Sequence, residues 1–365
     1  MKIVVLGGGY AGLACLARLA RVLPESERHL VDPNRWHLRR TQLHETLRRP
    51  LADLRADFAP IARRWGFRHH RARIAWTPDR LVEWSRAGRL PVGRRELEFD
   101  ALVVTTGLPG VAGRVSRSRT PPIPLEALAT GPGVNAWKRL ASADGRAWVV
   151  GAGASGLQCL FELAAARPQG APLGLVEASD TILASEPDGL RREVLERLDA
   201  LDLDIRLGTF YEGFGRGRVR MKGPSGKLSE PAAGVLLCTG PTGRRIEANA
   251  AGQVLHRRRP LPGVYAAGDC ARWHGVPFDA ATAQTAVRKG RHVAETVAQV
   301  AAGREPAHWD ARQLGFFLSL GPHDAIGWVF ARAALVNGLP AVAAREAVEA
   351  RWDLLLRGID SFAAF

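Results

Sequence analysis

Short apolar runs alternate along the chain with longer segments in which apolar residues recur at helical spacing. The runs Lys2–Leu6 and Ala147–Val150 predict buried strands, and a glycine-rich turn and an apolar-periodic helix follow each of them, the second helix ending near Ala166. Residues 29–31 and 173–176 predict the next strand in each case. Strands that are apolar throughout and alternate with helices are typical of a parallel sheet covered on both faces, so the pattern predicts an α/β fold.

The first of these units carries a dinucleotide-binding motif. Gly7, Gly9 and Gly12 occupy the three positions of GxGxxG directly after the first strand. The first glycine permits a tight turn, the second lets the backbone approach a pyrophosphate, and the third lets the helix pack closely on the strand. Asp32 ends the next strand 20 residues after Gly12, where a carboxylate accepts hydrogen bonds from a ribose 2′-hydroxyl. This register favours a bound dinucleotide over a glycine turn that merely opens a helix.

The same unit recurs 144 residues later in the chain. Gly151, Gly153 and Gly156 repeat the motif, and Glu177 ends the following strand 21 residues after Gly156. Two such units predict two dinucleotides, and an enzyme that holds two usually passes electrons between them. Both acids would repel a 2′-phosphate, which favours NAD(H) over NADP(H), although an arginine such as Arg191 could reverse that preference.

Three further strands end in turns of a recurrent kind. Residues 100–104 lead to Thr106-Gly107, residues 234–237 to Thr239-Gly240, and residues 263–267 to Gly268-Asp269, where a helix is predicted to begin. In isolation, Asp269 would be the amino-terminal cap of that helix. Together with the two glycine motifs, these segments resemble the two-dinucleotide-binding-domain flavoproteins of the pyridine nucleotide-disulfide oxidoreductase family, over about the first 290 residues.

The resemblance implies that the first unit binds FAD and the second binds NAD(H). It implies that Asp269 contacts the ribityl and pyrophosphate region of FAD. The residues expected to bind FAD are Gly7, Gly9, Gly12, Asp32, Arg40, Thr106, Gly107, Gly268, Asp269 and Gln284. Those expected to bind NAD(H) are Gly151, Gly153, Gly156, Gln158, Glu177 and Gly240. No metal site is expected, because the chain has no CxxC pair.

The cysteines and three short motifs indicate the branch of the family. The disulfide-reductase branch has a redox cysteine pair soon after the first acid, and residues 36–47 contain no cysteine. The spacing of the four cysteines also does not match the sulfide:quinone reductases. The chain instead resembles the type II NADH dehydrogenases, which pass electrons from NADH through FAD to a membrane quinone. The matching segments are Asp32-Pro33-Asn34-Arg35-Trp36-His37-Leu38, Leu43-His44-Glu45, Ala283-Gln284-Thr285-Ala286 and Ser319-Leu320-Gly321.

The chain departs from that family's pattern where the acceptor is expected. Arg288 replaces the second glutamine of the AQxAxQ motif, and Gln158 replaces a glutamate after the second glycine motif. Gln284 is predicted at the boundary between flavin and acceptor, and Gln284 and Arg288 are the candidate catalytic residues. Arg288 could stabilise anionic reduced flavin, orient a carboxylated or hydroxylated quinone, or point into solvent. His37 and His44 could relay protons, but a structural role is the preferred interpretation.

The net positive charge of the chain and its predicted last helix indicate which partners it could bind. The 365 residues include 51 Lys+Arg and 36 Asp+Glu, a net charge of +15, which suits an anionic membrane surface or an acidic partner protein. No nucleic-acid-binding motif is present, so nucleic acid is not an expected partner. A last helix is predicted at about residues 341–361, with an apolar stripe that packs on the chain's own core, on a homodimer partner, or on the membrane interface.

These features predict two Rossmann-like domains and a helical tail. The expected boundaries are residues 1–115 and 244–310 for the FAD-binding domain, 116–243 for an inserted NAD(H)-binding domain with a hinge at 116–124, and 311–365 for the tail. The favoured function is an NADH:quinone reductase that is cytoplasmic and peripheral on the inner face of the cell membrane. The alternatives are a soluble NADH-dependent reductase of oxygen or an acidic electron-transfer protein, and a non-enzymatic NADH-sensing flavoprotein.

Overall fold

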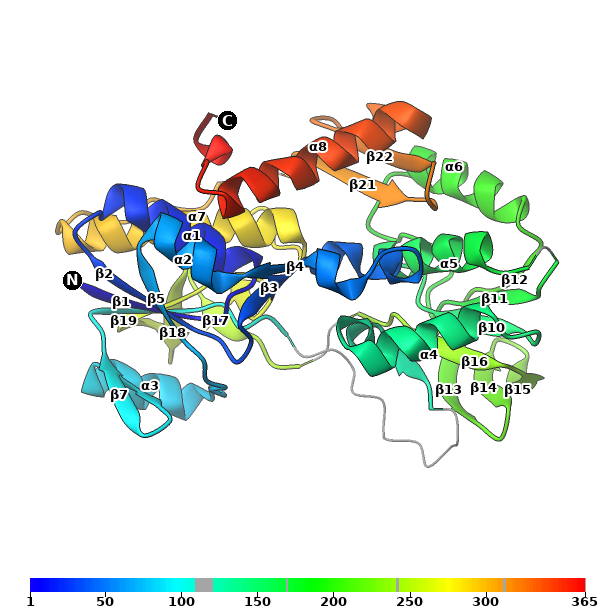
Figure 1. Cartoon of the computed structure of the whole chain (residues 1–365), viewed down its shortest axis with the longest axis horizontal. Coiled ribbons are helices and arrows are strands. Elements are labelled where there is room, and N and C mark those ends of the chain that lie inside the picture. Colours follow the sequence, from blue (N-terminus) through cyan, green and yellow to red (C-terminus); the bar gives the residue numbers. More distant parts are fainter. Residues whose placement is uncertain (109–120, 169, 241–242, 311–312, 365) are drawn as a thin grey trace.

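The structure is a computed structural model, and it describes residues 1–108, 121–168, 170–240, 243–310 and 313–364. It contains two large sheets (Figure 1). The strands of the first sheet lie within residues 2–104 and 246–273, and those of the second lie within residues 123–237. Residues 116–120 of the predicted hinge lie outside the described residues, and each of the three predicted domain boundaries falls on or beside residues that are not described. The boundaries therefore stay predictions.

The first sheet has eight strands in the order β20-β17-β18-β19-β8-β1-β2-β5. Five adjacent strands, from β19 to β5, are parallel. The strands are β1 (Lys2–Leu6), β2 (Glu27–Val31), β5 (Phe67–His70), β8 (Ala101–Val104), β17 (Ile246–Ala248), β18 (Gln253–His256), β19 (Arg259–Ala266) and β20 (Ala271–Trp273). Two short antiparallel pairs lie outside the large sheets, β3 (Trp36–Leu38) with β4 (Arg55–Asp57) and β6 (Arg89–Val92) with β7 (Arg95–Glu98).

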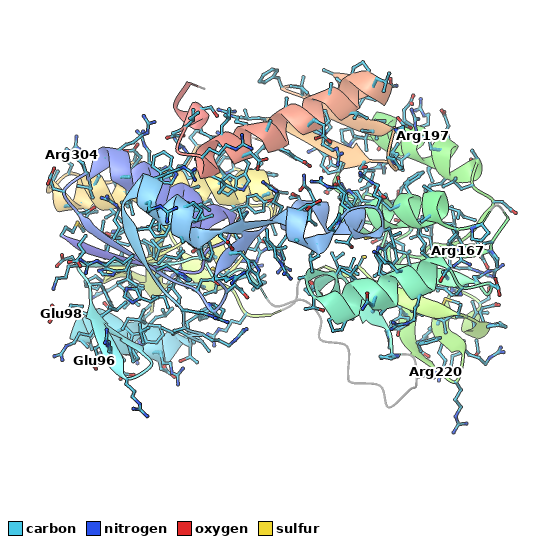
Figure 2. All side chains as sticks on the ribbon, viewed as in Figure 1. Glu96, Glu98, Arg167, Arg197, Arg220 and Arg304 are labelled. Carbon is cyan, nitrogen blue, oxygen red and sulfur yellow. The ribbon has the colours of Figure 1, made fainter. Side chains whose placement is uncertain are left out.

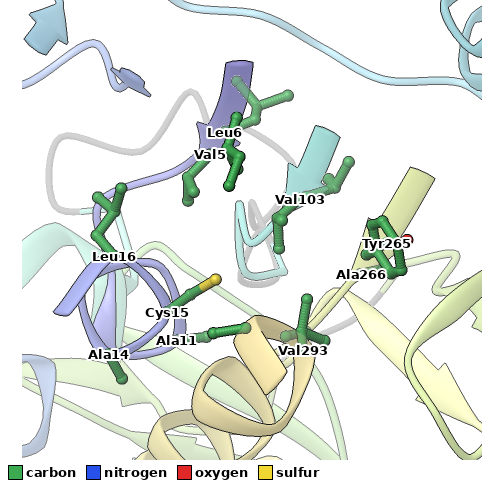
Figure 3. Packing of buried hydrophobic residues seen from close by; sticks show 14 of the residues in the cluster. Val5, Leu6, Ala11, Ala14, Cys15, Leu16, Val103, Tyr265, Ala266 and Val293 are labelled. Carbon is green, nitrogen blue, oxygen red and sulfur yellow. The ribbon is translucent and has the colours of Figure 1, made fainter. Parts of the chain in front are cut away.

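Two long helices pack together beside this sheet, α1 (Tyr10–Val22) and α7 (Ala283–Ala301). They approach so closely that a Cβ atom on Gly290 would lie 2.1 Å from the Ala11 carbonyl oxygen. Figure 3 shows Cys15 of α1 and Val293 of α7 facing the apolar side chains of β1, β8 and β19. The shorter helices of this part of the chain are α2 (Phe58–Trp65), α3 (Pro78–Ala87) and the 3-10 helices η1 (Arg40–Leu47) and η2 (Leu51–Leu54).

The second sheet has five parallel strands in the order β12-β11-β10-β16-β9. They are β9 (Ile123–Pro124), β10 (Ala147–Val150), β11 (Leu173–Val176), β12 (Leu203–Arg206) and β16 (Gly234–Leu237). The associated helices are η3 (Leu125–Ala129), α4 (Gly131–Ala141), α5 (Ala154–Ala166) and α6 (Asp188–Asp199). A three-stranded antiparallel sheet, β13 (Phe210–Gly215), β14 (Arg218–Gly223) and β15 (Gly226–Pro231), packs below it, with Arg220 pointing away from the fold in Figure 2.

The tail contains more than the predicted helix. It forms a three-stranded antiparallel sheet, β21 (Gly315–Ser319), β22 (Ala325–Val329) and β23 (Leu335–Asn337), followed by α8 (Gly338–Leu356) and η4 (Ser361–Ala364). Helix α8 extends along one side of the molecule, from the region of α6 to that of α1 and α7 (Figure 1). Trp352, Leu355 and Leu356 are buried in the core of the first sheet, so this part of the predicted apolar stripe packs on the chain's own core.

Most predicted elements occur where the sequence pattern puts them, and one does not. Strands β1, β10, β11 and β16 have the predicted bounds, and α5 ends at Ala166 as expected. The helix expected after Asp269 is absent: a turn at Asp269-Cys270 leads into β20, and the next helix, α7, begins only at Ala283. Asp269 is therefore not a helix cap. These residues form a strand because β20 pairs with β17, in which Ile246 lies opposite Ala271.

Candidate functional site

A cavity of about 1750 Å³ lies where the two glycine loops, the turns after β8 and β16, the start of α7 and the tail come together. It gathers most of the residues that the sequence singled out. Those that line it are Gly7, Gly9, Asp32, Arg40, Thr106, Gly107, Gly153, Gln158, Gly240, Gly268, Asp269, Gln284 and Arg288. Four of the predicted residues do not line it and instead pack against or bond to the backbone of the glycine loops or of the neighbouring strand end, namely Gly12, Gly151, Gly156 and Glu177.

In the first glycine loop, each glycine meets a different requirement. Gly7 has a positive φ of 108°, and Gly12 packs so tightly that a Cβ there would lie 2.0 Å from the Gly7 carbonyl oxygen. At Gly9 a Cβ would meet no atom within 4 Å. Gly9 is also the N-cap of α1 and has no side-chain cap, so the amino end of the helix is open toward the cavity. Such an end favours an anionic group.

The second loop repeats this arrangement. A Cβ on Gly156 would lie 1.8 Å from the Gly151 carbonyl oxygen, whereas one on Gly153, the N-cap of α5, would meet nothing within 4 Å. Gly151 itself packs against the strand-end carbonyl of Cys238, as Gly7 packs against that of Thr105. In each loop the first and third glycines therefore allow close packing, while the second borders open space.

The acids at the ends of β2 and β11 bond to the loops in equivalent ways. Asp32 Oδ2 accepts a hydrogen bond from the Gly8 N–H at 2.8 Å, and Glu177 Oε2 accepts one from the Ala152 N–H at 2.6 Å. The other carboxylate oxygen of Glu177 accepts from the Ser179 N–H at 2.8 Å. Both carboxylates thus orient the residue between the first and second glycines of a motif. Their contact with a ribose stays a prediction.

The turn residues predicted for the flavin lie on the same cavity wall. Trp76 Nε1 donates to Thr106 Oγ1 at 3.1 Å, and the preceding Thr105, which the sequence analysis missed, donates through Oγ1 to the Gly7 carbonyl at 2.8 Å. Asp269 is half-buried. Burial raises the pKa of its carboxyl, while the cations of Arg245, Arg40 and Lys289 oppose that rise.

The start of α7 connects the cavity to the tail. Gln284 Oε1 accepts a hydrogen bond from the Leu314 N–H at 3.2 Å. One turn further on, the guanidinium of Arg288 lies over the ring of Trp309 at 5.6 Å, and burial lowers its pKa. Arg288 is half-buried and lines the cavity, and its role toward the flavin or the acceptor stays a prediction.

A buried ion cluster holds the tail against η1, and the sequence analysis missed it. Glu45, only 1% exposed, lies 2.8 Å from Arg49, 3.0 Å from Arg345 of α8 and 3.2 Å from Arg48. Arg48 also bonds to the buried Glu162 of α5 at 3.1 Å. The motif Leu43-His44-Glu45 marked the position of Glu45, but Arg345 is 300 residues away in the chain, so no local pattern could have paired them.

His37 links the first glycine loop to α8. Its Nδ1–H donates to the Gly8 carbonyl at 3.0 Å, and its Nε2 lies 3.1 Å from Trp352 Nε1. Since an indole nitrogen is only a donor, Nε2 accepts and the ring is the neutral Nδ1–H tautomer. Burial lowers the pKa of His37 to about 4, and burial does the same for His44. The two hydrogen bonds of His37 fit the structural role that the sequence favours, and the roles of both histidines stay predictions.

The described residues contain no group of three or more His, Cys, Asp and Glu side chains that could hold a metal ion. None of their helices is both long and apolar enough to cross a membrane.

Two sheets that each bring a glycine loop to one cavity, with an acid at the end of the neighbouring strand bonded to that loop, are typical of a fold for two dinucleotides. Residues 1–290 match the model of the pyridine nucleotide-disulphide oxidoreductase family, and the chain belongs to that family of flavin-dependent NAD(P)H oxidoreductases. Members of the family typically bind FAD and NAD(P)H. The resemblance noted from the motifs is thereby confirmed at the level of the family.

Full-length relatives and solved structures share this architecture. The chain is 22% identical to the type II NADH:quinone oxidoreductase of Staphylococcus saprophyticus, over 98% of this chain and 96% of the relative. Its fold is similar to that of the sulfide:quinone oxidoreductase from Aquifex aeolicus, with a TM-score of 0.81 and 14% identity over 99% and 93% of the two chains. It is also similar to NDH2 from Plasmodium falciparum in complex with NADH, with a TM-score of 0.74 and 9% identity over 98% and 96%.

The depressed pKa of His37 predicts a loss of stability in acid. The unfolded chain, with a histidine pKa of 6.5, binds more protons than the folded chain down to about pH 4, so the stability present above pH 6.5 falls as the pH decreases through that range. His37→Gln retains a donor and an acceptor but does not titrate there. We expect the free energy of unfolding of this variant to fall less steeply with decreasing pH than that of the unmodified protein. The difference between the two slopes should be at most about 1.4 kcal/mol per pH unit.

Urea unfolding at several pH values between 4 and 7 would measure this difference. His308→Gln, a change at an exposed histidine, is the matched control. Equal pH slopes for His37→Gln and the unmodified protein would contradict the buried, neutral state of His37.

Proposed function

We propose that this protein is an FAD-dependent NADH dehydrogenase that passes electrons to a quinone at the membrane surface. The observation that carries the proposal is the continuity of the cavity. The same cavity is lined by residues of both glycine loops and by residues of α7 and the tail, among them Gln284, Arg288, Phe316 and Trp352. Full-length similarity to type II NADH:quinone oxidoreductases supports the same conclusion.

The residues present fit two pyrophosphate-containing ligands. Gly9 and Gly153 border the cavity with open space in place of a Cβ, and each is the uncapped start of a helix. The first loop, with Asp32 and Asp269, would hold FAD, and the second loop, with Gln158 and Gly240, would hold NAD(H). Glu177 would act by orienting its loop and accepting from the ribose of NAD(H).

The chemistry that a bound FAD would supply is hydride acceptance from NADH and transfer of two electrons to the acceptor. The chain's own residues would hold, orient and shield the reactants. Gln284, fixed by the Leu314 N–H, would border the flavin and the acceptor. The guanidinium of Arg288 would supply a positive charge beside an acceptor that gains electrons, and the aromatic rings of Phe316 and Trp352 would exclude water from a flat acceptor ring.

Rapid-mixing spectroscopy of the purified flavoprotein without oxygen tests this proposal. NADH should bleach the flavin absorbance within a second, and a short-chain naphthoquinone should restore it equally fast. Bleaching without recovery would contradict the quinone acceptor and favour an acidic electron-transfer protein or an NADH sensor. Absence of bleaching would contradict NADH as the electron donor.

Two alanine substitutions separate the two nucleotide sites. Gly9 and Gly153 have φ/ψ values of −75°/−169° and −76°/179°, which alanine adopts without strain, and the added methyl group would enter the cavity. We expect Gly153→Ala to raise the Kd for NADH by at least about tenfold, or about 1.4 kcal/mol, with normal FAD content. Gly9→Ala should lower FAD content instead.

Each of these variants is the control for the other, and titration with NADH and the flavin absorbance per protein are the measurements. Both should melt within a few degrees of the unmodified protein. Unchanged NADH affinity in Gly153→Ala would contradict the assignment of NADH to the second loop.

The surface of the tail supports peripheral binding to the inner face of the cell membrane. Leu339 and Ile359 are 73% and 55% exposed, and Phe330, in the turn after β22, is 83% exposed. A chain with a net charge of +15 would be attracted to anionic headgroups, into which such side chains could insert.

We expect the protein to sediment with vesicles that contain phosphatidylglycerol and to be released by high salt. The double substitution Leu339→Glu with Ile359→Glu should reduce the bound fraction at least about fivefold, because it places carboxylates where apolar groups would insert. Phe210→Glu, at an exposed apolar residue of β13, is the control and should bind normally. Equal binding of both variants would contradict a docking role for the tail.

A further inference from the structure

Helix α8 brings a carboxyl group to the wall of the cavity. Glu349 lies in the middle of that helix and lines the cavity, and 21% of its side chain is exposed. Gln42 of η1, which also lines the cavity, donates a hydrogen bond from Nε2 to Glu349 Oε2. The carboxyl is thus held at the cavity wall from the side of the first glycine loop.

The cations around Glu349 are already engaged by another acid. Arg345 Nη1 lies 3.0 Å from Glu45 but 3.8 Å from Glu349, and Arg49 bonds to Glu45 at 2.8 Å. Burial raises the pKa of the Glu349 carboxyl to about 7. The charged and titratable groups that face it are Arg345 and Glu346 on α8, Glu45 on η1, Arg49 just after η1, and Tyr10 on α1. The acids among them add to the rise, and the arginines oppose it.

Neighbouring groups on the cavity wall are less suited to give up a proton near neutral pH. His37 is neutral, and both of its ring nitrogens are engaged. Burial raises the pKa of Tyr10 to about 12, and its hydroxyl is hydrogen-bonded to Thr41 at 3.0 Å. Glu295, further along α7, is paired with Arg18. Gln158, on the wall of the second loop, has no acidic proton.

Reduction of a quinone to a quinol consumes two electrons and two protons. NADH supplies two electrons and one proton as a hydride, so the balance NADH + H⁺ + quinone → NAD⁺ + quinol requires one proton from elsewhere. We propose that Glu349 is the acid that gives this proton to a quinone oxygen in the part of the cavity that α8 lines. The carboxyl O–H bond breaks as the quinol O–H bond forms, and the carboxylate then takes a proton from solvent at its exposed edge. This inference rests on the proposed quinone reductase function.

Two electron acceptors distinguish a defect in proton delivery from a defect in electron transfer. A short-chain naphthoquinone needs protons to become a quinol, whereas ferricyanide takes one electron and no proton. In the full-length, FAD-loaded protein, we expect Glu349→Gln to lower quinone turnover at least about tenfold. Its ferricyanide turnover and its rate of flavin bleaching by NADH should stay within about twofold of the unmodified protein.

The pH dependence gives a second readout. Quinone turnover of the unmodified protein should fall as the pH rises through about 7, where Glu349 loses its proton, while Glu349→Gln should be low and independent of pH. Glu346→Gln, at an exposed acid on the same helix, removes the same charge and should retain quinone turnover. Because Glu346 adds to the rise of the Glu349 pKa, the pH profile of this variant should keep the same shape and shift only slightly to lower pH. Glu349→Asp should recover part of the activity.

A third readout does not depend on turnover. Infrared difference spectra between pH 5 and 9 should contain a protonated-carboxyl band that titrates near pH 7, is lost in Glu349→Gln and is shifted in Glu349→Asp. If Glu349→Gln loses FAD or melts early, the aspartate variant and this band decide the matter, and absence of such a band overturns the proposal. Normal quinone turnover in Glu349→Gln would also overturn it while leaving the quinone reductase function intact. Failure of the unmodified protein to reduce quinone would overturn both.

Discussion

The structure depends on one steric constraint, the close approach of a helix start to the strand turn before it. At Gly12 and Gly156, the helix lies so near the preceding loop that a Cβ would come within about 2 Å of a carbonyl oxygen. Because of this approach, the amino ends of α1 and α5 point into the cavity rather than past it. The acids after β2 and β11 then need only one backbone hydrogen bond each to orient the loops.

A second close contact, between α7 and α1, holds the start of α7 beside the first glycine loop. Gly290 lets α7 lie against the backbone of Ala11, in the first turn of α1. The start of α7, with Gln284 and Arg288, is thereby held beside the first glycine loop, although these residues are more than 270 positions apart in the chain. The helix pair thus brings the first glycine loop and the start of α7 to one cavity.

The repeated units could be predicted from sequence because their determinants are local. Strand β10, its glycines and Glu177 lie within about 30 consecutive residues, and each has its own steric or hydrogen-bonding requirement. The segment after Asp269 was predicted wrongly because pairing with β17, and not its own helix propensity, makes it a strand. The sheet of the tail packs against α5, α6 and α8, and the position of Glu349 depends on contacts with η1. No periodicity in the tail encodes these contacts.

Apolar burial and a buried ion pair hold the tail, and they contribute differently to its stability and to its register. Trp352, Leu355 and Leu356 bury apolar surface in the first core, which stabilises the docked helix but would tolerate small shifts along its axis. The pairing of Arg345 with the buried Glu45 adds little net free energy, since both charges lose water, but it penalises any register that leaves either one unpaired. Because Glu349 lies one turn after Arg345, the same pairing determines which carboxyl of α8 lies at the cavity wall. The ion cluster therefore specifies the site, while the apolar stripe supplies its stability.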